Sequence, residues 1–495
     1  MKVAEKAVSN TIYLFLNWIT MTVFSFVYWV IAGKLLLPSE YGMVTTGYQI
    51  MFLLGSLANL GLGVAVSKVI PELIASKKFD RIPTVIKFSL KVTLTIASLI
   101  AGVLLLLYPF LHQKIGFSLS DLIVISLGII FVQLSTFFSR IWYGFQNMKK
   151  IWINSSISQF IKLATAAILI YLGFSYFGPL VGLTLMYLVS FLLYFSPKFL
   201  KNGKYYNTKF LFYRLALPAF VANFFRIVFN NTQYIILSLL KTTQSTGYFS
   251  LAFMISVQVA AFVNVITSAI FPLISGLNIG KRKDSQSKLL TLGIRYGLLV
   301  SLPAALFIYF FAKPIILIFF RQEYLPSASI FSILLPGVIM FAIGNLILTN
   351  LYAIGKSKLY RNINLLVSFV YFSTAISFSY FFGFVGMAFS YLISAFINFI
   401  ISLYYGRKYF EIRMKKSEIG KIFLSLLVLG LIWKVVDSVN VNFFVKLAIV
   451  LLSFFVYSIV LKITKFYSKD DKRVIFIILE KTRLKKLEKI VGLFI

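Results

Sequence analysis

The chain has 495 residues, of which 60% are hydrophobic and only 13% are charged, and its mean hydropathy is +0.91. A soluble globular chain is about half apolar and about one quarter charged, so the composition excludes that class and indicates an integral membrane protein. The net charge of +35 would suit nucleic acid. However, Lys and Arg lie in short loops between apolar runs, as membrane topology requires, so we expect no nucleic-acid partner.

Long apolar runs fill most of the sequence. A membrane-spanning helix needs about twenty apolar residues, and by that measure we predict about fourteen spans. They lie near residues 11–33, 42–66, 88–111, 121–143, 152–173, 176–196, 214–240, 246–276, 290–311, 325–351, 362–382, 384–405, 420–438 and 443–463. The runs are too long for outer-membrane strands of about ten alternating residues, so the predicted fold is all-α. The first run is too long for a signal-peptide core, and we interpret it as a permanent span.

The basic residues are distributed unequally between the two sides of the membrane. With the N-terminus inside, most of the 49 Lys and Arg fall in the inner loops and the tail. The outer loops would hold only Lys34, Lys114, Lys241, Lys313, Arg321, Lys434 and Lys446. This asymmetry predicts that both termini are cytoplasmic. The expected location is the cell (plasma) membrane.

The loops are too short for a folded soluble domain on either side. The sequence has no cysteine, no Walker A motif, no metal-ligand cluster and no nucleophile–base pair, so we expect a transporter without cofactor or metal, and no enzyme. The predicted organisation is an N-terminal lobe at 1–196, a cytoplasmic linker at 197–213, a C-terminal lobe at 214–405, two further spans at 406–464 and a basic amphipathic tail at 465–495. Such a tail would lie on the anionic inner leaflet.

The two halves share short patterns in the same order. Lys150, Trp152 and Asn154 recur at a constant offset as Lys358, Tyr360 and Asn362. Tyr41-Gly42 opens the second span and Gly247-Tyr248 opens the eighth. Together with the equal span counts, these matches predict two pseudo-symmetric six-helix lobes, an arrangement in which transporters bind substrate between the lobes.

The span at 214–240 carries polar residues on one helical face, namely Asn223, Arg226, Asn230 and Gln233. Arg226 lies roughly 18 Å into this helix, near the midplane of a core about 30 Å thick. A charge at that depth is costly and by default faces a cavity or a partner. We therefore interpret this face as the lining of a polar cavity for an anionic cargo.

A second deep cation, Lys162, lies roughly 15 Å into its own span, with Gln159 on the same face. All fourteen Asp and Glu fall in predicted loops, at span ends or in the tail, so no carboxylate inside the membrane is expected to pair with Lys162 or Arg226. The two remaining alternatives are solvation by carbonyls and amides, or pairing with a substrate phosphate.

Other polar residues in spans are weaker candidates for substrate binding. Asn17, Gln49 and Asn59 could hydrogen-bond neighbouring helices or bind sugar hydroxyls. Lys91 and Arg295 lie near the cytoplasmic boundary, where they could extend to the headgroups or guide a phosphate inward.

Several segments, in order over nearly the whole chain, resemble one family. They are Gly33–Gly42 (GKLLLPSEYG), Gly247-Tyr248, Phe271–Ser275 (FPLIS), Phe319–Ala328 (FFRQEYLPSA) and Tyr352–Lys358 (YAIGKSK). They resemble the multidrug/oligosaccharidyl-lipid/polysaccharide (MOP) exporter superfamily, in particular its polysaccharide-transporter branch of Wzx-type flippases. Arg321 replaces a glycine of the family pattern.

The resemblance implies two six-helix lobes around a central cavity, two additional C-terminal helices, and alternating access that moves a polyprenyl-(pyro)phosphate-linked oligosaccharide outward. It also implies cationic residues in the cavity. Relatives often carry an acidic residue early in the seventh span, where this chain has Asn230, Asn231 and Gln233. This departure argues against ion coupling through a carboxylate.

The leading hypothesis is therefore a flippase for an anionic lipid-linked glycan, acting as a monomer among membrane lipids. A lipid II flippase carries the same charge chemistry and stays open as an alternative. A cation-coupled multidrug exporter of the same superfamily would need a membrane-embedded acid. A membrane glycosyltransferase or polymerase would need acidic catalytic residues or a sizeable outer loop, and neither feature is found in the sequence.

Overall fold

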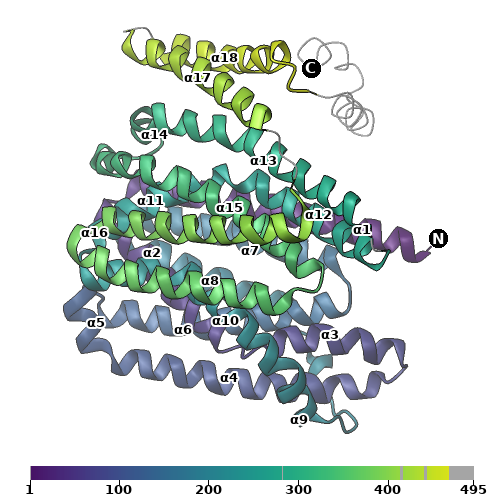
Figure 1. The fold of residues 1–495 in the computed structure, drawn as a ribbon. Helices are drawn as coiled ribbons and strands as arrows, with labels where there is room; N and C mark the ends of the chain where they lie inside the picture. The colour runs from purple at the N-terminus through teal and green to yellow at the C-terminus, as the bar shows by residue number, and fades with distance from the viewer. Residues whose placement is uncertain (1, 281, 413–415, 440–442, 468–495) are drawn as a thin grey trace. The chain divides into compact units, whose positions relative to one another are not determined.

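The computed structural model describes residues 2–280, 282–412, 416–439 and 443–467 (Figure 1). Every regular element in this part of the chain is helical, which agrees with the predicted all-α class. The predicted basic tail at 465–495 lies almost wholly outside the described residues.

The helices follow one another through short connections. The first half contains α1 (Lys2–Leu35), α2 (Pro38–Leu57), α3 (Leu62–Ala75), η1 (Phe79–Arg81), α4 (Ile82–Leu106), α5 (Tyr108–Ile115), α6 (Leu119–Gly144), α7 (Met148–Leu169), η2 (Ile170–Phe174) and α8 (Phe177–Tyr194). The linker region contains η3 (Pro197–Leu200), α9 (Thr208–Phe210) and η4 (Leu211–Ala216). The second half contains α10 (Leu217–Leu240), α11 (Thr243–Val259), α12 (Ala261–Ile279), α13 (Lys283–Phe310), α14 (Ala312–Phe319), η5 (Gln322–Ile330), α15 (Phe331–Ala353), α16 (Ser357–Phe410), α17 (Lys416–Ser438) and α18 (Phe443–Ile463).

Most predicted spans fall on one helix or on a consecutive pair, whereas the spans predicted at 362–382 and 384–405 both fall within α16, which is interrupted at Gly383. Among the described residues, ten helices are long and apolar enough to cross a membrane, and the bent pair α2–α3 is an eleventh candidate. The chain is thus a multi-pass membrane protein. The count of fourteen spans stays a prediction.

Several predicted spans are broken in the structure. The span predicted at 42–66 bends by 50° between α2 and α3, where Leu60 and Gly61 adopt positive φ values of 45° and 74°. A Cβ on Gly61 would overlap the Ala216 carbonyl oxygen, so both the backbone conformation and the close approach require glycine. The span predicted at 246–276 divides at Ala260 into α11 and α12.

Breaks recur at matching places in the two halves. Gly173, at the turn before α8, has a φ of 89°, and Gly383, which interrupts α16, has a φ of 60°. The break between α4 and α5 at Leu107 is matched by the break between α13 and α14 at Phe311. These matches support the predicted internal repeat. The arrangement of the repeats as two lobes around a cavity stays a prediction.

The chain packs into two compact units. Unit 1 comprises Met1–Phe253, Ile316–Ile330 and Asn364–Ser394, and unit 2 comprises Met254–Ile315, Phe331–Ile363 and Ala395–Ile495. Unit 1 combines residues from both predicted lobes. The domain boundaries inferred from the sequence stay a prediction.

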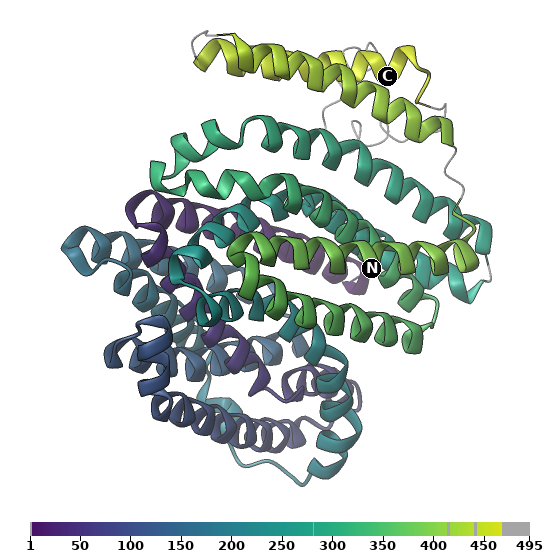
Figure 2. The ribbon, with the colours of Figure 1, turned by 60° about the vertical axis from the view of Figure 1, so that its left-hand side comes forward.

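Helix α6 is central to unit 1, because α2, α3, α4 and α8 all pack against it. Its side chains Phe137, Phe138 and Ile141 are fully buried. Helix α7 lies between α8 and α1. In unit 2, α12, α13 and α15 pack together. Helices α17 and α18 form a hairpin and lie side by side in both views (Figure 2). Helix α17 also packs on α13. The buried Trp433 joins this hairpin by donating a 2.7 Å hydrogen bond to Ser453.

Candidate functional site

Lys162 is a buried cation between α7 and α1. The residue is only 3% exposed. The ammonium lies 3.5 Å from the Ser25 hydroxyl and 4.6 Å from the centre of the Tyr28 ring. No described Asp or Glu forms an ion pair with it. A desolvated cation–π contact contributes about 2 kcal/mol, much less than the several kcal/mol lost when a charge leaves water, so Lys162 is strongly under-compensated.

Packing around Lys162 fixes its position. The Tyr28 hydroxyl donates to the Pro179 carbonyl at 3.1 Å, which holds the aromatic ring beneath the ammonium. On the other side of α7, a Cβ on Gly182 would lie 2.9 Å from the Lys162 carbonyl oxygen. Glycine therefore lets α8 approach the backbone of α7 at the level of the cation.

Helices α1 and α7 run in the same direction. The Trp152 indole, near the start of α7, donates to the Thr20 hydroxyl at 3.1 Å. Lys162, farther along α7, reaches Ser25 and Tyr28, which are farther along α1. This orientation is the one expected for the first and fifth spans of a chain that crosses the membrane at each span.

Three predicted site residues present buried acceptors without a donor. They are Gln159 Oε1, Gln49 Oε1 and Asn17 Oδ1, for which no hydrogen-bond partner exists in the described part of the chain. Gln159 precedes Lys162 by three residues and so shares its helical face. A buried acceptor left unsatisfied costs about 1–3 kcal/mol. These amides can accept hydrogen bonds from hydroxyl groups, which is the chemistry that a sugar offers.

Asn59 has partners within the protein. Its amide donates to Gln133 Oε1 at 3.2 Å, and its carbonyl oxygen accepts from the Gly63 N–H at 2.8 Å. The second bond satisfies a backbone donor in the first turn of α3. These contacts give Asn59 a role at the break between α2 and α3, and its predicted part in binding stays a prediction.

The polar face of α10 is described only in part. Asn223 donates to the Ala219 carbonyl at 2.8 Å. Gln233 is 2% exposed and accepts from the Tyr371 hydroxyl at 3.1 Å. The side chains of Arg226 and Asn230 lie outside what the structure describes. The common cavity face of these four residues therefore stays a prediction.

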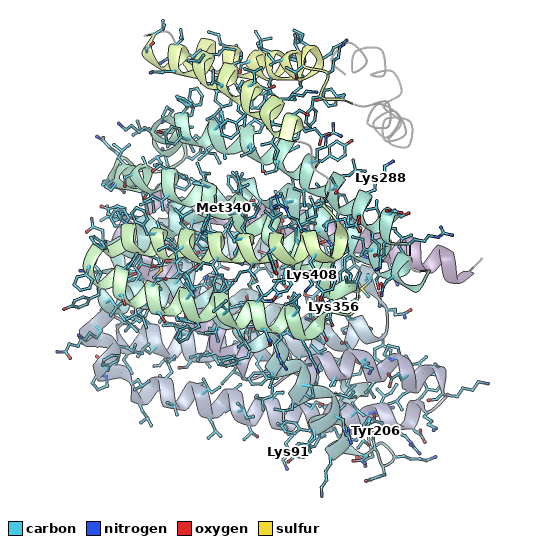
Figure 3. The ribbon with its side chains drawn as sticks, viewed as in Figure 1. Lys91, Tyr206, Lys288, Met340, Lys356 and Lys408 are labelled. Atoms are coloured by element: carbon cyan, nitrogen blue, oxygen red, sulfur yellow. The ribbon has the colours of Figure 1, made fainter. Side chains whose placement is uncertain are left out.

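Lys91 is exposed on α4 (Figure 3). It shares a helical face with the exposed side chains of Leu99, Val103 and Leu106. An exposed apolar face on a membrane helix is the kind that meets lipid. This placement favours the first sequence alternative, in which the ammonium extends to the headgroups.

Arg295 is buried and engaged by its own chain. Its guanidinium lies 3.8 Å from the Glu418 carboxylate, donates to the Phe466 carbonyl and stacks 4.2 Å from the centre of the Phe466 ring. Neither sequence alternative anticipated this arrangement. Glu418 lies at the start of α17 and Arg295 in the first half of α13. The signal in the sequence that could have paired them was that both residues are predicted to lie near the cytoplasmic side of the membrane.

Comparison with protein-family models shows which family the chain belongs to. A family model described as "Polysaccharide biosynthesis protein" matches residues 7–278, which is more than half of the sequence. The chain belongs to this family. A second model, "Lipid II flippase MurJ", matches residues 212–455. A comparison with curated proteins finds no sequence match.

Solved structures show that this polysaccharide biosynthesis family member has a MOP-type transporter fold. The lipid II flippase MurJ in an inward closed conformation is 19% identical, has a TM-score of 0.71, and the alignment covers 91% of this chain and 98% of that one. An inward-facing multidrug resistance MATE transporter of the MOP superfamily is 15% identical, with a TM-score of 0.69 and coverage of 81% and 97%. The resemblance inferred from the sequence is confirmed, and the chain is a flippase- or transporter-type membrane protein of the MOP superfamily.

Proposed function

We propose that the protein is a flippase that moves a polyprenyl-(pyro)phosphate-linked oligosaccharide from the cytoplasmic to the outer leaflet by alternating access. One observation carries this proposal. Lys162 is a deeply buried cation, and no described carboxylate is paired with it. A phosphate is the ligand that would compensate such a charge, because charge-assisted hydrogen bonds to phosphate are short and strong.

Other buried polar groups suit the rest of such a substrate. Gln159, Gln49 and Asn17 carry acceptors without donors in the described structure, and sugar hydroxyls can donate to them. We propose that Arg226, with Asn223, Asn230 and Gln233, forms a second part of the same site on α10. An inside-negative potential would assist outward movement of the anion by about 2.3 kcal/mol per charge per 100 mV.

The biological setting follows from the same chemistry. The flippase would act as a monomer in the plasma membrane, with both termini cytoplasmic and with two six-helix lobes moving around the site. Its product would supply the assembly of a surface polysaccharide or of a glycoprotein glycan. This is the work of a transporter and not of an enzyme.

A lipid II flippase is the second candidate, because the MurJ family model matches residues 212–455. Its cargo is also an anionic lipid-linked diphosphate. The polysaccharide model covers residues 7–278, including α1 and α7, on which Lys162 and its neighbours lie. This coverage favours the glycan assignment for the half of the chain that holds the described cation.

Complementation of a glycan pathway that lacks its flippase tests the proposal. The wild-type protein should restore the surface glycan, Lys162→Arg should retain part of the activity, and Lys162→Met should lose it. Removal of a charge-assisted hydrogen bond costs about 1.5–3 kcal/mol, or roughly ten- to hundredfold in rate.

The matched control is Lys114→Met, which applies the same substitution to an exposed residue of α5 and should leave the glycan at the wild-type level. Because Lys162→Met removes an uncompensated buried charge, it should not weaken folding. A wild-type protein that restores no glycan but extrudes cationic dyes would show that the cargo assignment is wrong. Wild-type glycan in Lys162→Met would remove Lys162 from the site.

A further inference from the structure

The linker between α8 and α10 is fastened to the loop between α3 and α4. The Lys204 N–H donates to the Asp80 carbonyl at 2.8 Å, and the Thr84 hydroxyl donates to the Lys204 carbonyl at 2.7 Å. The Lys204 ammonium also pairs with the Asp80 carboxylate at 2.8 Å. A Cβ on Gly203 would lie 2.7 Å from the Thr84 hydroxyl oxygen and 2.8 Å from the Asp80 carbonyl oxygen. The two segments therefore approach so closely that a side chain at position 203 would have to displace one of them.

A second contact fixes the linker a few residues earlier in the chain. Phe199 of η3 is buried, and the centre of its ring lies 5.5 Å from that of Trp142 and 6.0 Å from that of Phe145. The element η3 also packs against α4. Between the two contacts, the Lys87 ammonium donates to Asn202 Oδ1 at 3.0 Å. The linker therefore has a fixed position along the ends of α4 and α6.

These contacts set the level of the linker relative to the membrane. The span predicted on α4 begins near residue 88, and Thr84 precedes it by one helical turn. At 1.5 Å per residue, Thr84 is about 6 Å outside the hydrocarbon core. Each headgroup layer is roughly 5–7.5 Å thick, since a bilayer of about 40–45 Å encloses a core of about 30 Å. We therefore expect the linker backbone at Lys204 to lie at the level of the lipid headgroups.

Cations and aromatic side chains are exposed together where the two segments meet. Residues 77–87 and 197–209 contain eight Lys and Arg but one acid, Asp80, which is paired with Lys204. Among these cations, Lys77, Lys78, Lys198 and Lys201 are exposed. Phe79 is 56% exposed and Tyr205 is 81% exposed. We call the surface formed by these exposed residues the basic–aromatic platform, namely Lys77, Lys78, Phe79, Lys198, Lys201 and Tyr205.

The composition and the level of this platform suit an anionic lipid surface. Lys and Arg attract the anionic headgroups of the cytoplasmic leaflet, and each such residue near the surface strengthens binding about fivefold. Aromatic rings are enriched at the headgroup level, where their apolar and polar parts are both accommodated. An acidic soluble protein would match the charges, but it would not account for exposed rings at that level.

We propose that the basic–aromatic platform binds anionic phospholipid headgroups of the cytoplasmic leaflet, and that the close contact at Gly203 holds the linker in the position that this binding needs. The side of the membrane follows from the predicted topology, with the N-terminus inside. The cargo does not enter the proposal, because the platform would bind the leaflet whichever substrate the protein moves.

A fluorescent label on the linker tests the proposal. The chain has no cysteine, so Tyr205→Cys carries a single fluorophore in the full-length protein. In vesicles that contain phosphatidylglycerol, a nitroxide on the lipid headgroups should quench this fluorophore, and acrylamide in the water should reach it poorly. In the triple variant Lys78→Gln/Lys198→Gln/Lys201→Gln, both signals should shift to their values in vesicles of phosphatidylcholine alone.

Two further variants separate the platform from net charge and from general effects on the fold. Gly203→Val keeps every charge but forces the linker away from Thr84, and it should shift both signals as the triple variant does. A fluorophore on Tyr171→Cys, which replaces a 90% exposed tyrosine before α8, should not respond to the triple variant. Wild-type signals in Gly203→Val would overturn the role of this contact.

Titration of phosphatidylglycerol into the protein in neutral detergent, followed with the Tyr205→Cys fluorophore, measures the affinity. The triple variant should bind about hundredfold more weakly, because each lysine contributes about fivefold. The control Lys114→Gln/Lys241→Gln/Lys313→Gln removes as many charges from exposed residues of predicted outer loops and should leave this affinity at the wild-type level. Equal access of acrylamide in anionic and neutral vesicles, or an unchanged affinity in the triple variant, overturns the proposal. A protein that binds the lipid as expected but exports no glycan would refute the proposed cargo alone.

Discussion

Arg295 either stabilises the fold or handles substrate, and separate measurements of thermal stability and of transport in variants decide between these roles. In the structure its guanidinium is held by Glu418, the Phe466 carbonyl and the Phe466 ring. Loss of one partner of a fully buried ion pair costs 3–5 kcal/mol, as an approximate range. Because the pair is long, at 3.8 Å, and the Glu418 side chain is 21% exposed, we reduce the expected cost of Glu418→Gln to about 1–2 kcal/mol.

Thermal unfolding of the purified protein measures this cost. A loss of 1–2 kcal/mol corresponds to a fall in Tm of about 2–8 °C for a domain of roughly 200 residues. The double substitution Arg295→Met/Glu418→Gln should recover part of the loss, because it removes the charge that Glu418→Gln leaves without its carboxylate. Glycan export per folded molecule should stay at the wild-type level in Glu418→Gln.

The opposite pattern would refute this reasoning. If Arg295→Met reduces export per folded molecule while Glu418→Gln leaves Tm unchanged, Arg295 handles substrate. The alternative predicted from the sequence, in which Arg295 guides a phosphate inward, would then be correct.

Further substitutions test local features of the fold. Gly61→Ala should lower Tm, since it forces a Cβ into a left-handed backbone that meets a carbonyl, whereas Gly102→Ala, in open space on α4, should gain about 0.5–1 kcal/mol. Gly182→Val should push α8 away from the Lys162 backbone and cost about 1–3 kcal/mol, and a loss of export larger than the loss of folded protein would tie this packing to the site. Tyr371→Phe should cost about 1 kcal/mol, because it removes a buried hydrogen bond. An unchanged Tm in Gly61→Ala or Tyr371→Phe would contradict the corresponding contact.

The sequence predicted the helical elements well because membrane helices carry a strong local signal. Runs of about twenty apolar residues mark them, and even the turn at Gly383 falls between two predicted spans. The break at Gly61 was not predicted, because its cause is the approach of Ala216, which is a tertiary contact. A helical pattern that continues through such a position gives no local indication of a bend.

The candidate site could also be predicted only where the signal is local, and not where it depends on tertiary contacts. Depth along a helix and the absence of acids predicted that Lys162 is buried without a carboxylate partner, and the structure shows this among the residues that it describes. The Glu418 partner of Arg295 was missed because it depends on how α13 packs against α17. The Tyr28 ring under Lys162 was missed for the same reason, since aromatic residues occur in nearly every span and their spacing does not show which one meets the cation.

Movement of a lipid-linked anion past Lys162 is the central claim, and reconstitution measures it most directly. Purified protein in liposomes would be given a polyprenyl diphosphate-linked oligosaccharide, and the rate at which the glycan changes leaflet would be followed with an impermeant glycan-modifying reagent. We expect wild type and Lys114→Met to move the lipid at the same rate and Lys162→Met to be slower by about tenfold or more. No movement by the wild-type protein, or equal rates for wild type and Lys162→Met, would contradict the claim.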